Sequence, residues 1–259
     1  MSKTRTIARR VLGPLTGLLL FLQAALVLTG GAVRLTGSGM GCPTWPECVP
    51  GSYLPVEGQA EGALHAWIEF GNRLLTFALF FAAVATLIAV VRSGRRDLRF
   101  LAATQILGIL AQGVLGGITV LTNLNPLSVA SHLLLSIILI AAATSLHSRR
   151  HHPQVRTSST QVRISRLSLA HIVVAFIAIA IGTLVTGSGP HAGDVDAPRL
   201  DFDISTITRL HSSSVWILLI ITFIFYRSKD LRFDTKKWLN IFILLAVAQG
   251  ALGYIQYWL

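Results

Sequence analysis

The chain has 259 residues, of which 53% are hydrophobic and only 13% are charged, and its formal net charge is +11. A soluble domain carries about 25% charged residues, so this composition excludes an ordinary soluble domain and indicates a membrane protein. The positive charge does not indicate nucleic-acid binding, because 18 of the 22 Lys and Arg residues lie in four short segments beside apolar runs, at 1–10, 92–99, 148–166 and 227–237.

Seven apolar runs reach the roughly 20 residues that a helix needs to cross a bilayer. In chain order, the sequence predicts helices at 11–33, 65–91, 100–122, 127–147, 165–187, 204–226 and 237–258. The basic segments alternate with more acidic loops along this series. The positive-inside rule therefore places the N-terminus in the cytoplasm and the loops 34–64 and 188–203 on the outer face.

The segment VRLTGSGMGCPTWPEC (33–48) leads from the first predicted helix into the first outer loop. Cys42 and Cys48 are the two cysteines of the chain, and both lie in this loop, on the side of the membrane that permits disulfides. We expect them to pair, because a structural zinc site needs four ligands and two thiolates alone make a poor metal site. The segment is either an ordinary loop pinned by a disulfide or the lid of a site at the outer face.

The second predicted helix carries ionisable and polar groups within its apolar run. Glu69, Asn72 and Arg73 are spaced at i, i+3 and i+4, so they share one face of the helix. Ionisable groups inside a membrane are costly and mark a functional site by default. This face of the helix is therefore a candidate site.

Histidines occur at matched depth in two further helices. His132 in the fourth predicted helix and His211 in the sixth each lie one to two turns below the outer surface. A single such histidine often only hydrogen-bonds to a neighbouring helix, but two at equal depth favour a haem, whose iron takes axial ligands from opposite sides. Three arginines near the outer face either snorkel to the interface or pair with haem propionates: Arg34, Arg73 and Arg209.

The chain contains an internal repeat. GGAVRLTGSG (30–39) is similar to IGTLVTGSGP (181–190), and ILAQGVLGGITV (109–120) is similar to LAVAQGALGYIQ (245–256). The matches keep the same order, and each half starts and ends on the same side of the membrane. We therefore predict a parallel repeat of the kind found in some transporters.

The repeat predicts an all-α polytopic fold of two pseudo-symmetric four-helix bundles. Residues 1–147 form the N-terminal half, 148–164 a basic cytoplasmic linker and 165–259 the C-terminal half. By this comparison the second half lacks its fourth helix. We expect either a fragment without the eighth helix, which would carry a ligand equivalent to His132, or a seven-helix variant.

The stretch TGGAVRLTGSGMGCPTWPEC, followed by IEFGNR and two helical halves, resembles haem A synthase, the family that includes bacterial haem A synthases and mitochondrial Cox15 proteins. The resemblance implies oxidation of the C8 methyl group of haem O to a formyl group, through a hydroxylated intermediate, to give haem A for terminal oxidases. It also implies a haem b cofactor in the C-terminal half and haem O as substrate in the N-terminal half.

The resemblance assigns roles to individual residues. It implies that Glu69 is the catalytic glutamate, that His132 lies at the substrate haem and that His211 binds the haem b iron. It also implies that Cys42 and Cys48 are the cysteine pair of the first outer loop. The cysteines have no counterpart in the second half, so we expect their disulfide to brace a lid over the haem O site.

The chain departs from the family pattern at Asn72, where histidine is usual. Asparagine is a poor iron ligand, although its amide can hydrogen-bond to water or to the porphyrin edge. We assign Asn72 and Arg73, together with His132, to the substrate haem site. The second departure is the absent eighth helix, which would carry the other haem b ligand.

Two alternative classes of function predict different features of the sequence. A membrane haem b electron-transfer protein without haem modification would have two bis-histidine sites, and Asn72 argues against it. A transporter would have broken helices at mid-membrane, whereas the polar groups here cluster at the outer face. By resemblance we expect a protein of the bacterial plasma membrane, with haem O synthase and terminal oxidase assembly factors as partners. We expect no nucleic-acid partner. Whether the chain forms a homo-oligomer is left open by the sequence.

Overall fold

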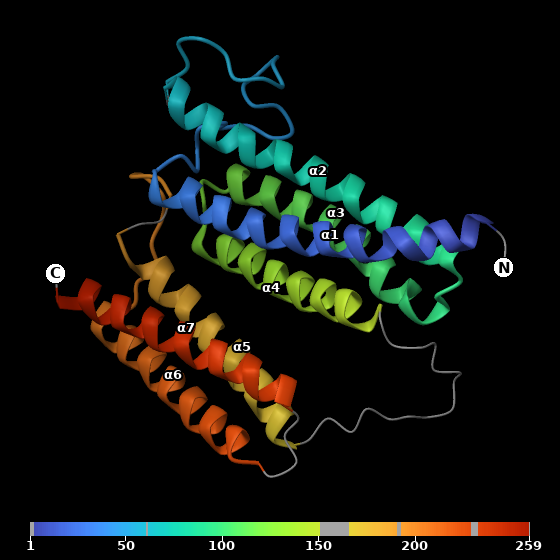
Figure 1. Cartoon of the computed structure of the whole chain (residues 1–259). Helices are drawn as coiled ribbons and strands as arrows, with labels where there is room; N and C mark the ends of the chain where they lie inside the picture. The colour runs from blue at the N-terminus through green and yellow to red at the C-terminus, as the bar shows by residue number, and fades with distance from the viewer. Residues whose placement is uncertain (1–2, 61, 151–165, 191–192, 229–232, 259) are drawn as a thin grey trace. The chain divides into compact units, whose positions relative to one another are not determined.

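The structure is a computed structural model that describes residues 3–60, 62–150, 166–190, 193–228 and 233–258. Within these ranges there are helices and turns but no strand (Figure 1). Seven of the described helices are long and apolar enough to cross a membrane. The chain is therefore an all-helical polytopic membrane protein, as the sequence predicted.

Each of the seven long helices overlaps a predicted one. Their bounds are α1 (Lys3–Leu35), α2 (Ala63–Ser93), the short 3-10 turn η1 (Arg96–Leu98), α3 (Arg99–Leu121), α4 (Pro126–Arg149), α5 (Arg166–Ser188), α6 (Ile204–Tyr226) and α7 (Phe233–Trp258). The largest difference is that α1 begins at Lys3 and not at residue 11. Arginine is a good helix former, so the basic segment continues the helix beyond its apolar run.

Contacts divide the chain into two compact units. Unit 1 contains residues 1–160 and 186–201, and unit 2 contains residues 161–185 and 202–259. In unit 1, α1 and α3 each pack against both α2 and α4, so every helix has two neighbours (Figure 1). This arrangement is a four-helix bundle, in which α1 and α2 are joined by a long loop and the later helices by short connections.

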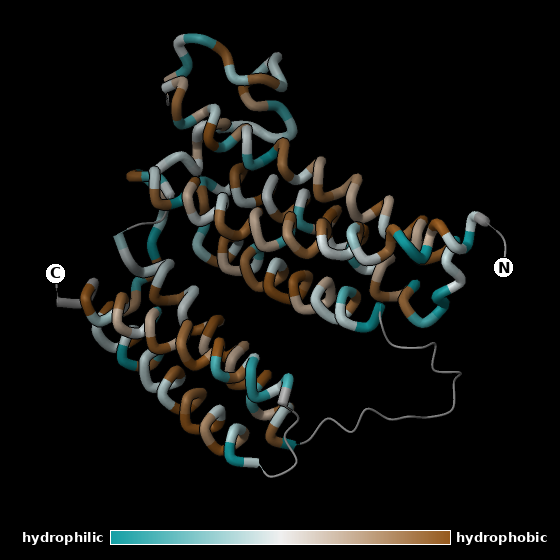
Figure 2. Tube along the Cα trace, viewed as in Figure 1, coloured by the Kyte–Doolittle hydropathy of each residue, from teal (hydrophilic) through white to brown (hydrophobic). Residues whose placement is uncertain are grey.

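The core of unit 1 consists of aliphatic side chains at the helix contacts. Figure 2 shows that hydrophobic residues run along the helices, while the hydrophilic ones gather near the helix ends. The outward faces are also apolar, which suits a lipid environment. Buried core side chains include Leu12, Leu19, Leu79, Val90, Leu98, Ile109 and Leu146.

A pair of buried amides crosses the core of unit 1. The Nε2 of Gln23 on α1 donates to the Oε1 of Gln105 on α3, at 2.9 Å. The Nε2 of Gln105 then donates to the carbonyl oxygen of Leu139 on α4, at 3.1 Å. Both side chains are buried, and such bonds hold helices together where water is absent.

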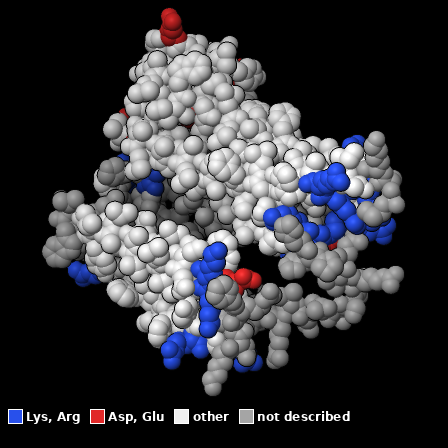
Figure 3. Space-filling view, in the orientation of Figure 1, with Lys and Arg blue, Asp and Glu red and all other residues white. Residues whose placement is uncertain are grey.

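Lys and Arg side chains gather at the end of unit 1 where α1 begins and α2 ends (Figure 3). There Arg95 forms an ion pair with Asp97 at 2.7 Å and donates to the carbonyl oxygens of Arg149 and Arg150. A cation at these carbonyls stabilises the C-terminal end of α4. Residues 151–164 of the predicted linker lie outside the described residues.

Unit 2 contains α5, α6 and α7, of which α6 and α7 pack together. His171 of α5 lies beside the rings of Phe225 on α6 and Phe242 on α7, with ring centroids 6.2 and 5.1 Å away. These contacts bring all three helices together near one end of the unit. The functional division into two halves stays a prediction.

Candidate functional site

The first loop, residues 36–62, joins α1 to α2 and contains the cysteines. Cys42 and Cys48 form a disulfide, and both are buried. A short turn follows directly, because Val49 and Ser52 form an isolated β-bridge and the amide of Cys48 donates to the carbonyl of Ser52 at 2.9 Å. The expected pairing is therefore present, and we call residues 42–48 the disulfide loop.

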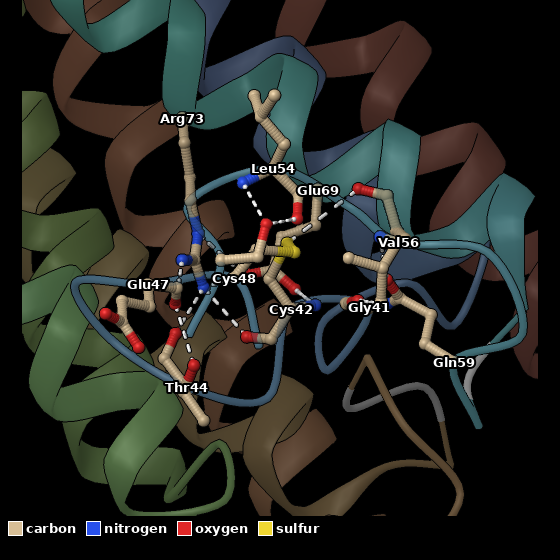
Figure 4. Close-up of a disulfide and its surroundings, with 12 residues drawn as sticks. Gly41, Cys42, Thr44, Glu47, Cys48, Leu54, Val56, Gln59, Glu69 and Arg73 are labelled. Atoms are coloured by element: carbon tan, nitrogen blue, oxygen red, sulfur yellow. Dashed lines mark hydrogen bonds and ion pairs between the residues drawn. A yellow bond between two sulfur atoms is a disulfide. The ribbon is translucent and has the colours of Figure 1, made fainter. Parts of the chain in front are cut away.

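Glu69, in the second turn of α2, points at the disulfide loop (Figure 4). Its Oε2 accepts a hydrogen bond of 2.6 Å from the amide of Cys42. Its Oε1 accepts from the Nη2 of Arg73 at 2.6 Å and from the Nε at 3.1 Å. The carboxylate is thus held from two sides, and only 8% of the Glu69 side chain is exposed.

Arg73 lies one turn further along α2 and extends across the disulfide loop (Figure 4). Besides Glu69, its guanidinium donates to three main-chain carbonyl oxygens. These belong to Cys42 at 2.8 Å, Thr44 at 3.1 Å and Glu47 at 3.2 Å. One side chain therefore binds both the carboxylate and the loop above it.

Glycines allow the first loop to pack directly on the helices. A Cβ on Gly41 would overlap the carbonyl oxygen of His65 and lie 2.8 Å from the amide nitrogen of Ala66, at the start of α2. A Cβ on Gly117 of α3 would lie 2.5 to 2.9 Å from ring atoms of Trp45. The loop therefore packs closely against α2 on one side and against α3 on the other.

Asn72 lies on the neighbouring stripe of α2 and contacts α1. Its Oδ1 accepts a hydrogen bond of 2.6 Å from the hydroxyl of Thr29. His65, at the start of α2, has its Nδ1 2.9 Å from the hydroxyl oxygen of Ser38 in the first loop. Both side chains thus connect α2 to other segments without entering the cluster around Glu69.

His132 lies in the second turn of α4, where Gln112 of α3 approaches it. The Nε2 of Gln112 donates to the carbonyl of His132 at 3.0 Å and to the hydroxyl of Ser136 at 2.7 Å. The Nδ1 of His132 and the Oε1 of Gln112 are buried without a hydrogen-bond partner among the described residues. Gln112 is not among the predicted site residues, although its AQG motif recurs in both halves.

His211 of α6 contacts α5 in unit 2. Its Nδ1 lies 3.0 Å from the carbonyl oxygen of Ala178. A carbonyl only accepts, so Nδ1 carries a hydrogen, and in the neutral ring Nε2 then carries the lone pair, as in most metal-binding histidines. A Cβ on Gly182 would lie 3.0 Å from the Cε1 of His211, so this glycine makes room for the ring.

The other two predicted arginines belong to other helices, Arg34 to α1 and Arg209 to α6. The Nη2 of Arg34, at the end of α1, donates to the carbonyl of Thr186 at 2.9 Å. The amide of Gly39 donates to the carbonyl of Gly193 at 2.9 Å, so the loop after α5 is joined to the first loop within unit 1. Arg209 is exposed in the first turns of α6.

Four residues predicted from the sequence form one connected cluster at the end of the unit 1 bundle: Cys42, Cys48, Glu69 and Arg73. The remaining predicted site residues have neighbours of their own. Asn72 contacts α1, His132 lies beside α3, and His211 contacts α5. The cluster presents one buried carboxylate, its cation and a covalently closed loop.

Comparison with known proteins gives matches along most of the chain. The haem A synthase of Exiguobacterium sibiricum is 26% identical over 247 residues, which cover 89% of this chain and 81% of that protein. The haem A synthase of Shewanella oneidensis is 28% identical over 181 residues, which cover 62% of this chain and 51% of that protein. The haem A synthase of Geobacillus kaustophilus is 33% identical over 102 residues, which cover 39% of this chain and 30% of that protein.

The chain thus spans about a third to a half of the length of the Geobacillus and Shewanella proteins. No solved structure matches it. Residues 14–193 match the COX15-CtaA family, whose description is cytochrome oxidase assembly protein. This match includes the whole first loop, the Glu69–Arg73 pair and His132. The chain belongs to the COX15-CtaA family of cytochrome oxidase assembly proteins.

Proposed function

We propose that the chain acts as a haem A synthase, which oxidises the C8 methyl group of haem O to a formyl group through a hydroxylated intermediate. The observation that carries this proposal is the buried pair of Glu69 and Arg73 beneath the disulfide loop. Charged groups within an apolar membrane helix are costly and are kept for function. The haem A synthases among its relatives support the same activity.

Glu69 is the residue that we assign to the chemistry. Its carboxylate is fixed by the amide of Cys42 and by Arg73, so it does not need to reorganise when charge develops nearby. In that position it either stabilises positive charge at the oxidised carbon or accepts the proton that this carbon loses. Either role needs an ionised and correctly aimed carboxylate.

The residues of unit 2 fit a haem b. His211 donates through Nδ1 to Ala178, which leaves Nε2 available for iron, and Gly182 leaves room beside the ring. Bound haem b supplies one-electron redox chemistry. We propose that His211 is the ligand of unit 2 for its iron.

For the substrate haem O we propose a site in unit 1 that includes His132 and Asn72. The unpartnered Nδ1 of His132 and Oε1 of Gln112 support it, because buried polar atoms are normally paired and a bound ligand satisfies them. The amide of Asn72 gives a hydrogen-bonding group where the family usually has an iron ligand. Arg73 was also expected at the substrate haem. Its contacts instead assign it a different role, in which it acts through Glu69.

We propose that the protein lies in a bacterial plasma membrane with its N-terminus in the cytoplasm and the disulfide loop on the outer face. The gathering of Lys and Arg at the opposite end of unit 1 supports this orientation (Figure 3). By resemblance, haem O synthase and terminal oxidase assembly factors are the partners to look for. A homo-oligomer of this chain is a further candidate assembly to look for.

Pigment extraction from cells that make haem O and express the full chain tests the activity. We expect haem A from the unchanged chain and about a hundredfold less from Glu69→Ala, the scale of a lost acid–base group. Glu57→Ala, which removes an exposed carboxylate of the neighbouring first loop, is the matched control. Undiminished haem A in Glu69→Ala would refute its role, and haem b without haem A in the unchanged chain would refute the activity.

The haem b ligand is tested by absorbance of the purified chain. We expect His211→Ala to lose the haem b spectrum and His171→Ala to keep it. His171 lies in the same unit but packs against aromatic rings. Equal haem content in the two variants would contradict the assignment of His211.

A further inference from the structure

The guanidinium of Arg73 is almost fully used inside the cluster (Figure 4). Its Nε and Nη2 donate to Glu69, and Nη2 and Nη1 donate to carbonyl oxygens of the disulfide loop. A guanidinium has five N–H donors, and these bonds leave one of them, on Nη1, without an acceptor among the described residues. A ligand carboxylate therefore finds no two-pronged grip on Arg73, although such a grip is what favours arginine at carboxylates.

The three carbonyls that accept from Arg73 lie in the ring that the disulfide closes. They belong to Cys42, Thr44 and Glu47, and the bond between Cys42 and Cys48 joins the two ends of that segment. Two further hydrogen bonds hold the segment. The hydroxyl of Thr44 donates to the carbonyl of Glu47 at 2.9 Å, and the amide of Gly51 donates to the Glu47 carboxylate at 2.9 Å. The closed loop thus presents a fixed set of acceptors to one cation.

The same loop and the same cation fix both oxygens of Glu69. Arg73 binds Oε1, and the amide of Cys42 binds Oε2. We infer that Arg73 is a positioning residue that couples the closed disulfide loop to Glu69 and thereby aims the carboxylate. The inference rests on the proposed function only in naming the reaction in which Glu69 takes part. The coupling between the disulfide loop and α2 does not depend on that reaction.

Coupling of this kind is reciprocal. If loop closure favours the Arg73–Glu69 arrangement by some factor, that arrangement favours loop closure by the same factor. Weakening Arg73 or Glu69 must then make the Cys42–Cys48 bond easier to reduce. This consequence is measurable without haem and without turnover.

The first experiment measures the thiol–disulfide equilibrium of the purified full chain in mixtures of reduced and oxidised dithiothreitol. Each reduction converts one protein disulfide and one dithiothreitol into two protein thiols and one cyclic disulfide. We expect Arg73→Lys to shift this equilibrium about tenfold toward the thiols, or about 30 mV, because an ammonium cannot span the carboxylate and three carbonyls in one plane. Glu69→Gln, which keeps the shape of the side chain, shifts it in the same direction.

Arg199→Lys is the matched control for this measurement. Arg199 also donates to three carbonyls of its own loop, those of Pro190, Asp194 and Ala197, but it has no hydrogen bond to Glu69 or to the disulfide loop. The double variant Arg73→Lys with Glu69→Gln should shift the equilibrium by less than the product of the single shifts. Equal equilibria for Arg73→Lys and Arg199→Lys, or independent effects in the double variant, would overturn the inference.

The second experiment separates positioning from ligand binding by the kinetics of haem A formation. We expect Arg73→Lys to lower kcat at least tenfold and to leave KM for haem O within twofold, since a positioning residue acts on the reacting step. A raised KM with unchanged kcat would instead assign Arg73 to the haem propionates. If the unchanged chain forms no haem A but the equilibrium shifts are found, the proposed function fails and the coupling stands.

Discussion

Gly41→Ala should lift the first loop from α2 and break the contact that carries Glu69. The added Cβ would overlap the carbonyl oxygen of His65 and lie 2.8 Å from the amide nitrogen of Ala66. Both are main-chain atoms of a helix and cannot turn away, so the loop must retreat by about an ångström to reach ordinary contact with the carbonyl oxygen of His65. The next residue is Cys42, whose 2.6 Å hydrogen bond to Glu69 is stretched by the same movement. We expect the free energy of unfolding to fall by about 1–3 kcal/mol, which is the usual cost of an overpacked site.

Gly71→Ala is the matched control, because a Cβ there meets nothing within 4 Å and the residue lies inside α2. In a helix this change gains about 0.5–1 kcal/mol. Thermal unfolding of the purified chain and the rate at which dithiothreitol reduces the disulfide report the two effects. Gly41→Ala should melt a few degrees lower than the control and be reduced faster. Equal melting temperatures and equal reduction rates would refute the account of how the loop is seated.

Asp203 caps α6, and hydrogen bonds from Thr206 and Ser205 lower the pKa of its carboxyl from 3.8 to about 2. A lowered pKa stabilises the fold above pH 3.8, and this contribution is lost as the pH falls toward 2. Asp203→Ala should therefore flatten the pH dependence of thermal unfolding in that interval, and an unchanged profile contradicts the cap. Gln105→Leu should cost about 1–3 kcal/mol in thermal unfolding, because it leaves the buried Nε2 of Gln23 without an acceptor. Adding Gln23→Leu should recover part of this loss, and strictly additive losses would contradict the buried pair.

The seven helices could be predicted because each apolar run is long and because a membrane leaves the helix as one of very few ways to satisfy the backbone. Their ends were less predictable. α1 begins at Lys3 and α7 at Phe233, each several residues before the start predicted from its apolar run, at 11 and 237. In both cases charged residues extend the helix, since propensity and not hydropathy decides where a helix starts in water.

The candidate site was predictable where it follows helical spacing and at the two cysteines, whose disulfide is confirmed. Glu69 and Arg73 are four residues apart, so a shared helix face was predicted, and in the structure they form an ion pair with each other. The acceptors that Arg73 finds beyond Glu69 are main-chain carbonyls of a loop without periodicity, so no residue type identifies them. The close packing of that loop on α2 depends on Gly41. In the sequence, nothing distinguishes Gly41 from the other glycines of the same segment.

Asn72 and His211 each lie on the helix that follows a TGSG motif, α2 in unit 1 and α6 in unit 2. His211 contacts α5 at a point where Gly182 leaves space, because a Cβ there would lie 3.0 Å from the ring. Aligning the TGSG motifs of the two halves places Ala32 at the position of Gly182, so α1 carries a methyl group where α5 carries none. Asn72 of α2 contacts α1 one turn before Ala32, with its Oδ1 2.6 Å from the hydroxyl of Thr29. The contact between α2 and α1 in unit 1 therefore uses an amide, whereas the contact between α6 and α5 in unit 2 uses an imidazole.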